Sequence, residues 1–330
     1  MKIRNRLTHL IIGIIISLVF LYFSLRNIQF DQFVDALSKT SIRIFVLSLV
    51  PTFLAFWFRA IRWKILLQPM GRYTGSELFG PMMVGFMGNN IFPARIGEIL
   101  RAYAVSKKLK ISLPSSLATI ILERLFDGIV LIGMLLVVVF MYPFPARIKH
   151  IGYLIALIYG VLLLVLFFIQ KSPQRTENVI MKILFFLPHP IRDRIRKMLD
   201  SFITGFSILR DFKRTIIILG HSLGVWISSA LILYVILLAC RMTDLPITAS
   251  LVILAITAIG SMIPAAPGYI GTSQYFTIIA FSVFRIGESQ ALAYSIVYFV
   301  SQYVPVTLVG IFYFYYDRIS LADIELNKVT

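Results

Sequence analysis

Long apolar stretches separated by short basic segments make up most of this 330-residue chain. A spanning helix needs about 20 mostly apolar residues, because the hydrocarbon core of a bilayer is about 30 Å thick. Stretches of this kind occur at 8–25, 42–58, 115–141, 151–169, 215–239 and 290–316. The pattern therefore predicts an all-α integral membrane protein with about six spanning helices, folded as a single polytopic domain over 1–330.

Two further stretches, 76–105 and 247–285, are apolar but broken in the middle. The first breaks at NNIFPARIG and the second at PAAPGYIGTSQ. Proline and glycine in such positions end a helix. We therefore expect two re-entrant or interrupted helical hairpins. Paired breaks of this kind are typical of transporter sites near the middle of the membrane.

Basic residues orient these segments, because cytoplasmic loops are enriched in Lys and Arg. The first residues, MKIRNR, predict a cytoplasmic N-terminus and a retained first spanning helix. Two more basic segments are expected in the cytoplasm: 59–72, with Arg59, Arg62, Lys64 and Arg72, and 107–110, with Lys107, Lys108 and Lys110. Hairpin 76–105 would then enter from the cytoplasmic side, and hairpin 247–285 from the opposite side.

The second half of the chain leaves the side of the C-terminus open. Loops 240–246 and 286–289 are nearly neutral, so a single bent crossing at 247–285 is the alternative to a hairpin. Segment 182–213 has apolar residues at three- and four-residue steps beside basic residues, which predicts a cytoplasmic amphipathic helix. It would lie on anionic headgroups, with partner binding as the alternative.

Composition supports the membrane interpretation and excludes other classes. The chain is 58% hydrophobic and 14% charged, whereas soluble domains carry about a quarter charged residues. The net charge of +17 follows from the cytoplasmic basic loops, and no nucleic-acid-binding motif accompanies it. One cysteine, Cys240, and four scattered histidines give no metal-binding spacing. We expect no cofactor, no metal and no nucleic-acid partner.

Two charged groups fall inside apolar sequence, in FPARIGEILRAY at 92–103 and in ILERLFDGIV at 121–130. Their members are Arg95, Glu98, Arg101, Glu123, Arg124 and Asp127. An ionised side chain at a helix centre costs about 2.5–3.5 kcal/mol, so such residues face protein or a water-filled cavity. One interpretation is an ion network that holds the first hairpin against helix 115–141. The other is a cavity for a charged headgroup, because arginine binds phosphate through two nitrogens.

The two breaks supply further candidates for the headgroup site. A helix should begin near Ala94, and Thr272 or Ser273 should cap a second half-helix that runs to about Phe284. Helix N-termini bind anions. The candidates at the breaks are Asn89, Asn90, Gly268, Gly271, Thr272 and Ser273. A kinked helix with close packing at the two glycines is the alternative for PAAPGYIGT.

The segment GHSLG at 220–224 matches the G-x-S-x-G motif of serine nucleophiles. The G-x-S-x-G elbow requires a strand before the serine and a helix after it. This stretch opens an apolar helical span, so we do not expect Ser222 to be a nucleophile. Close helix approach at Gly220 and Gly224 is the expected role.

Three motifs in order, R-x-G-E-x-x-R at 95–101, E-R-x-x-D at 123–127 and P-G-x-x-G at 267–271, resemble the lysylphosphatidylglycerol synthase transmembrane (flippase-like) family. The resemblance extends from about residue 8 to residue 316. It implies a membrane domain that moves lipids, including aminoacylated phosphatidylglycerol, between leaflets. Some members carry a fused aminoacyl-transfer or glycosyltransferase domain, and we expect this chain to be the stand-alone membrane domain. A separate synthase or glycosyltransferase is the partner that this implies.

The expected function is translocation of a phosphate-bearing lipid, aminoacylated or isoprenoid-linked, in a prokaryotic plasma membrane. Arg95, Arg101 and Arg124 would bind phosphate, while the carboxylates would orient them or relay protons. Anionic phospholipids or lipid phosphates are the expected partners, and no ATP-binding motif is present. We expect no enzymatic activity. The alternatives are a membrane enzyme acting on lipid phosphates and a non-transporting partner subunit of a lipid- or glycan-modifying enzyme.

Overall fold

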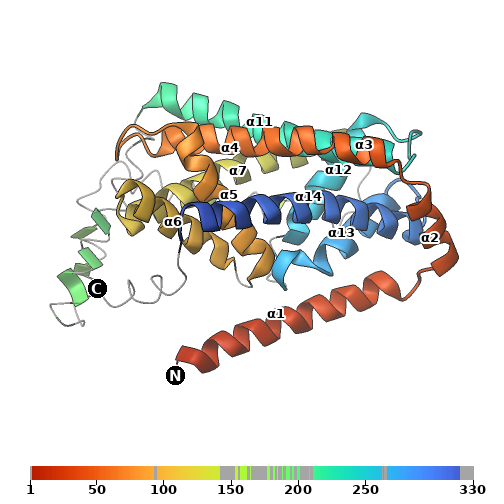
Figure 1. Ribbon diagram of the computed structural model, residues 1–330, viewed down its shortest axis with the longest axis horizontal. Coiled ribbons are helices and arrows are strands. Elements are labelled where there is room, and N and C mark those ends of the chain that lie inside the picture. The colour runs from red at the N-terminus through yellow and green to blue at the C-terminus, as the bar shows by residue number, and fades with distance from the viewer. Residues whose placement is uncertain are drawn as a thin grey trace.

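The computed structural model describes residues 2–92, 95–141, 211–261, 263 and 266–319, with scattered residues between 153 and 208. All regular elements among these residues are helices. Most of the helices run along one long axis and form an elongated bundle (Figure 1). The prediction of an all-α protein is confirmed.

Within the described part of the chain, four stretches are long and apolar enough to cross a membrane. They are Ile42–Leu66, built from α3 (Ile42–Leu47) and α4 (Leu49–Leu66), then α7 (Leu113–Met141), α11 (Phe212–Ala239) and α14 (Glu288–Tyr316). Helices α1 (Lys2–Leu25) and α2 (Phe30–Ser38) are a further candidate. The part of α1 from Gly13 to Leu25 meets α2 at an angle of 92°, and the two count as a fifth span if they form one broken helix. The predicted span 151–169 and the predicted amphipathic segment 182–213 lie mostly outside the described residues.

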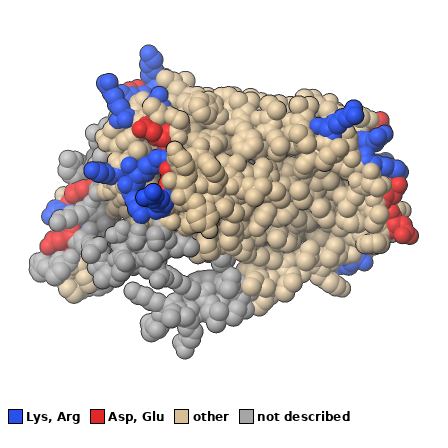
Figure 2. All heavy atoms as spheres, in the orientation of Figure 1, with Lys and Arg blue, Asp and Glu red and all other residues tan. Residues whose placement is uncertain are grey.

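Charged side chains gather at the two ends of the bundle, and an uncharged band separates them on the face in Figure 2. Large apolar side chains are exposed along the spans, including Trp57 on α4, Ile227 on α11 and Leu308 on α14. An exposed apolar band between charged ends matches the hydrocarbon core between its headgroup layers. The protein is a multi-pass membrane protein.

The first interrupted segment is a tight helical hairpin of α5 (Gly75–Ile91) and α6 (Ile96–Leu109). Glycines line its interface, and a Cβ on Gly97 would lie 2.0 Å from the carbonyl oxygen of Gly85. Small residues allow two helix backbones to approach this closely. The break predicted within 76–105 is present, with Arg95 in the left-handed conformation (φ 54°) just before α6.

The second interrupted segment consists of α12 (Ile247–Ser261), the short helix η2 (Pro267–Tyr269) and α13 (Thr272–Ser282). The predicted break is present, but the predicted cap is wrong because Gly271 precedes the helix. The Gly271 N–H donates to Gln274 Oε1 at 2.7 Å, and its φ is 88°. A Cβ there would lie 2.3 Å from the carbonyl oxygen of Ser17 on α1, so only glycine fits.

The first hairpin follows α14 from its C-terminal end to its middle. Near that end, Lys108 Nζ donates to Asp317 Oδ1 at 2.9 Å, just beyond the last turn of α14. At the hairpin tip, Asn90 Nδ2 donates to Thr307 Oγ1 at 2.9 Å. The tip of this hairpin therefore reaches the central part of α14.

The second hairpin approaches the same point from the other end of α14. The ring of Phe281 packs on Tyr294, with centroids 4.8 Å apart, near the start of that helix. Farther along, a Cβ on Gly268 would lie 2.9 Å from Tyr303 Cε2. The two hairpins thus enter from opposite ends of the bundle, as predicted, and their tips meet beside the middle of α14.

Candidate functional site

A cluster of charged residues joins α4, α6 and α7 in the interior of the bundle. Asp127 lies fourteen residues after the start of α7 at Leu113, which is about 21 Å along the helix. Ion pairs of 4.0 Å or less connect all of its members: Arg59, Arg62, Glu98, Arg101, Glu123, Arg124 and Asp127. The cluster therefore lies near the middle of the long apolar helix α7.

Arg101 and Glu123 form the most enclosed pair of the cluster. The Nη1 and Nη2 groups of Arg101 donate to the two oxygens of Glu123 at 3.1 and 2.8 Å. The guanidinium carbon also lies 3.8 Å from the centre of the Trp63 ring. Both side chains are buried, at 2% and 0% exposed. Arg101 therefore ties α6 to α7 and does not face the cavity described below.

Arg62 belongs to this cluster, although the sequence placed it in a cytoplasmic loop. It donates to Asp127 Oδ1 at 2.6 Å and to Ser222 Oγ at 2.8 Å, and it is fully buried. The loop prediction is wrong for Arg59 and Arg62 because α4 continues to Leu66. Hydropathy ended the span at the first arginine. Apolar Trp63 and Leu66, four and seven residues after Arg59, were the sequence signal that the helix continues, and both are buried in the structure.

Ser222 lies inside helix α11, and its hydroxyl donates to the carbonyl of Ile218 at 2.9 Å. No strand precedes it among the described residues, so the elbow geometry is absent there. Gly224 packs as expected, because a Cβ would lie 3.1 Å from the Phe58 ring of α4. The same prediction is wrong for Gly220, which has nothing within 4 Å of that position among the described atoms.

Arg124 and Arg95, the other two arginines predicted to bind phosphate, lie in different parts of the structure. Arg124 lies 3.2 Å from Glu98 and 3.4 Å from Asp127, so carboxylates occupy two of its sides. Arg95 points elsewhere and donates to the carbonyl of Ser261 at 2.8 Å, at the end of α12. The three charges of FPARIGEILRAY therefore have three different partners.

Arg59 is the most weakly paired arginine of a cluster that has one excess positive charge among the described residues. Four arginines face three carboxylates, which leaves one positive charge uncompensated. Among the described residues, Arg59 donates no hydrogen bond; its nearest carboxylate is Asp127, with 3.5 Å between Nη1 and Oδ2. Its guanidinium carbon lies 5.4 Å from the centre of the Phe86 ring. A buried donor without an acceptor is unfavourable unless another group binds it.

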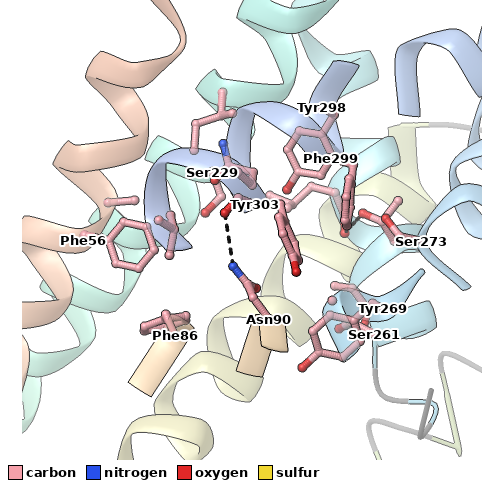
Figure 3. Close-up of a pocket in the computed structure, with 18 of the residues that line it drawn as sticks. Phe56, Phe86, Asn90, Ser229, Ser261, Tyr269, Ser273, Tyr298, Phe299 and Tyr303 are labelled. Carbon is pink, nitrogen blue, oxygen red and sulfur yellow. Dashed lines mark hydrogen bonds between the residues drawn. The ribbon is translucent and has the colours of Figure 1, made fainter. Parts of the chain in front are cut away.

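A cavity of about 330 Å³ lies beside Arg59, where the two hairpin tips meet α4, α11 and α14. Figure 3 shows Tyr298, Phe299 and Tyr303 of α14 close to Tyr269 and Ser273 of the second hairpin. Asn90 of the first hairpin approaches from the other side and donates to the Tyr303 carbonyl at 3.4 Å. The cavity wall thus combines aromatic rings, hydroxyls, amides and one arginine.

The six predicted break residues divide between this cavity and its surroundings. Asn90, Gly268 and Ser273 line the cavity. Thr272 is buried and donates to the Tyr269 carbonyl at 3.1 Å, while Gly271 packs on α1. Asn89 lies against Gly97 at the hairpin interface, and its Oδ1 has no hydrogen bond within the described part of the chain.

Sequence reasoning missed Arg59 and most of the aromatic wall. Tyr298, Phe299 and Tyr303 occur in a span rich in aromatic residues, where lipid-facing and cavity-facing positions look alike. Their spacing of four and five residues places them on one side of α14, but it does not say what that side faces.

The fold and the order of its charged motifs define a family. The sequence pattern described as Lysylphosphatidylglycerol synthase TM region matches residues 10–310, nearly the whole chain. The chain belongs to this family, as its motifs predicted.

Two membrane proteins are similar to this chain along nearly their whole length, and a third protein is similar over a shorter stretch. A UPF0104 membrane protein of Methanocaldococcus jannaschii is 24% identical over 323 residues, covering 94% of this chain and 95% of that one. A UPF0104 membrane protein of Methanothermobacter thermautotrophicus is 23% identical over 312 residues, covering 89% and 91%. Glycosyltransferase AglD of Haloferax volcanii is 28% identical over 142 residues, which is 40% of this chain and 23% of that protein.

Proposed function

We propose that this protein translocates a phosphate-bearing lipid between the leaflets of a prokaryotic plasma membrane, with its N-terminus in the cytoplasm. The headgroup enters the cavity between the hairpin tips, and the hydrocarbon chains stay in the bilayer. The observation that carries this proposal is the position of Arg59. It is the excess cation of a buried cluster, and it lines the cavity.

An anionic group in the cavity would neutralise the excess positive charge of the cluster. A phosphodiester carries one negative charge, and its oxygens accept hydrogen bonds from a guanidinium. Neutralising a buried cation in this way is favourable because water is excluded from its surroundings. We therefore assign phosphate binding to Arg59 in place of Arg95, Arg101 and Arg124, which were the residues first expected.

The rest of the cluster has a supporting role in this proposal. Arg62, Arg101 and Glu123 connect three helices through buried ion pairs, so they hold α6 and α7 at fixed positions beside the cavity. Removing one of them would damage the fold before it changed lipid recognition. Arg95 bridges the two hairpin tips and would influence their separation.

The match to glycosyltransferase AglD covers only part of each protein. It is too short to indicate a partner for this chain. A separate synthase or glycosyltransferase partner, and the absence of enzymatic activity, stay predictions.

The test uses purified protein in liposomes that carry a fluorescent phosphatidylglycerol in both leaflets. Dithionite quenches the outer leaflet at once, and any further loss reports movement from the inner leaflet. We expect Arg59→Gln to slow this movement about 10- to 100-fold, since it removes one charge-assisted hydrogen bond. Gln keeps a polar side chain of similar length without the charge.

Arg214→Gln is the matched control, because Arg214 pairs with Asp211 at the exposed start of α11, far from the cavity. It should move lipid like the wild type. Equal rates for Arg59→Gln and wild type, at equal folded yield, would contradict the role of Arg59. A wild type that moves neither phosphatidylglycerol, phosphatidic acid nor a polyprenyl phosphate would contradict translocation itself.

A further inference from the structure

We infer that the cavity recognises a neutral polyhydroxyl headgroup, about one sugar ring in size, attached to the lipid through a single phosphodiester. This inference rests on the proposed function and adds the class of headgroup. It follows from the hydroxyls, rings, charge and volume of the cavity.

The cavity presents several hydroxyl groups that have no hydrogen-bond partner within the described structure. Among the described residues, the side-chain hydroxyls of Tyr269, Tyr298, Tyr303 and Ser273 make no hydrogen bond, and all four residues line the cavity. The Gln302 amide nitrogen is already used on Thr52 at 2.9 Å, which leaves its oxygen as an acceptor. Hydroxyls both donate and accept, so a ligand rich in hydroxyls can satisfy several of them together.

Aromatic faces line the same space. The rings of Phe299 and Tyr303 are stacked with centroids 4.9 Å apart and planes at 26°. Trp226 adds an indole whose buried Nε1 has no partner among the described residues. A sugar ring offers apolar C–H faces to such rings and hydroxyl edges to the donors around them.

The charge of the wall selects against an aminoacylated headgroup. Arg59 is the one charged residue among those that line the cavity in the described structure, and no carboxylate joins it. A lysyl ester would bring two ammonium groups next to this guanidinium, and no carboxylate among the described lining residues would pair with them. Like charges in a site of low dielectric repel strongly, so a neutral headgroup on a monoanionic phosphate fits better.

The volume limits the size of the headgroup. The cavity of about 330 Å³ lies at the lower end of small-ligand sites, which span about 300–1,000 Å³. It has room for one sugar ring and its phosphate, so further rings would have to lie outside the cavity.

The experiment measures how far added lipids raise the unfolding midpoint of the purified full-length protein in detergent. Titration converts these shifts into apparent dissociation constants. The probes are phosphatidylinositol, which carries a neutral six-membered polyol, phosphatidylglycerol and lysyl-phosphatidylglycerol. Free inositol 1-phosphate tests whether the ligand is a lipid or a soluble phosphate. We expect phosphatidylinositol to bind about tenfold more tightly than lysyl-phosphatidylglycerol. Free inositol 1-phosphate should bind more weakly than phosphatidylinositol and more weakly than phosphatidylglycerol.

Two variants separate the polyol from the phosphate. Tyr303→Phe keeps the stacked ring and removes one hydroxyl, so it should weaken phosphatidylinositol binding about three- to tenfold and phosphatidylglycerol binding less. Arg59→Gln should weaken both lipids by the same factor. Tyr313→Phe is the control, because Tyr313 packs on Phe79 outside the cavity.

The outcomes distinguish the two proposals. If lysyl-phosphatidylglycerol binds as tightly as phosphatidylinositol, or if Tyr303→Phe weakens both polyol lipids equally, the polyol inference is overturned. Translocation of phosphatidylglycerol that depends on Arg59 would still support the proposed function. Tight binding of free inositol 1-phosphate without any lipid binding, or stabilisation by none of the probes, would also overturn the polyol inference. The proposed function would fail only if the liposome assay detected no movement of any of its three lipids.

Discussion

The two hairpins reach the same point beside α14, but different forces hold them. The α5–α6 hairpin is fixed by the buried pair of Arg101 with Glu123 and by backbone contact at Gly97. The α12–α13 hairpin has no charged residue from 247 to 284. Its anchors are apolar contacts and single hydrogen bonds, such as the one from the Ala266 N–H to Ser17 Oγ at 2.7 Å.

This difference matches what each hairpin gives to the cavity. The charged cluster behind the first hairpin places a cation, Arg59, at a fixed position. The second hairpin supplies Tyr269 and Ser273, whose hydroxyls are neutral and unpaired among the described residues. A buried charge needs rigid compensation, because moving it without its partners exposes its full desolvation cost. Neutral hydroxyls do not carry that constraint, so a shift of the second hairpin would cost less free energy than a shift of the first.

The largest effect should come from Glu123→Gln in the cluster. It removes the carboxylate that Arg101 and Arg62 share, at 2.8 and 3.0 Å. Breaking a buried ion pair on one side costs about 3–5 kcal/mol, since the remaining charge stays uncompensated. Unfolding of the purified protein by denaturant in detergent would measure this loss.

The control for this prediction is the double variant Arg101→Met with Glu123→Leu. Replacing both partners by apolar residues leaves fewer unpaired charges, so it should restore part of the lost stability. A Glu123→Gln variant as stable as the wild type would show that the cluster does not hold the first hairpin.

A smaller effect is expected from Gly97→Ala at the α5–α6 interface. The added Cβ would lie 2.0 Å from the Gly85 carbonyl oxygen and 2.4 Å from the Asn89 nitrogen, and backbone cannot yield easily. Overpacking of this kind costs about 1–3 kcal/mol. The same denaturation experiment measures it, with Gly133→Ala on α7 as the matched control, because its Cβ meets no described atom within 4 Å. Equal stability of the two variants would mean that the hairpin interface is not tightly packed.

The smallest effect is expected from Ser17→Ala, which removes the hydrogen bond to the Ala266 N–H. One hydrogen bond contributes about 0.5–1.5 kcal/mol, so the global loss is small. Hydrogen exchange should nevertheless become faster at the second hairpin tip, around Gly268 and Tyr269, while α6 stays protected. Faster exchange in both hairpins, or in neither, would contradict the assignment of this hydrogen bond to the second hairpin alone.

The sequence predicted the elements more completely than the site. Apolar stretches located α7, α11 and α14, and the two proline- and glycine-containing breaks located both hairpins. These follow from local properties: the length of an apolar run and the residues that end a helix. Periodicity alone did not show that Arg59 and Arg62 lie inside the bundle, because a charge at a helix end looks like a loop residue in a hydropathy profile.

By itself, the sequence determined that this is a helical membrane protein of a recognisable family with charges buried in its interior. Only the tertiary structure decided how those charges pair. Arg101 is enclosed by Glu123, Arg95 bridges to Ser261, and Arg59 is left at the cavity. Pairing depends on distances between helices that are far apart in the chain, and a motif carries no information about such distances.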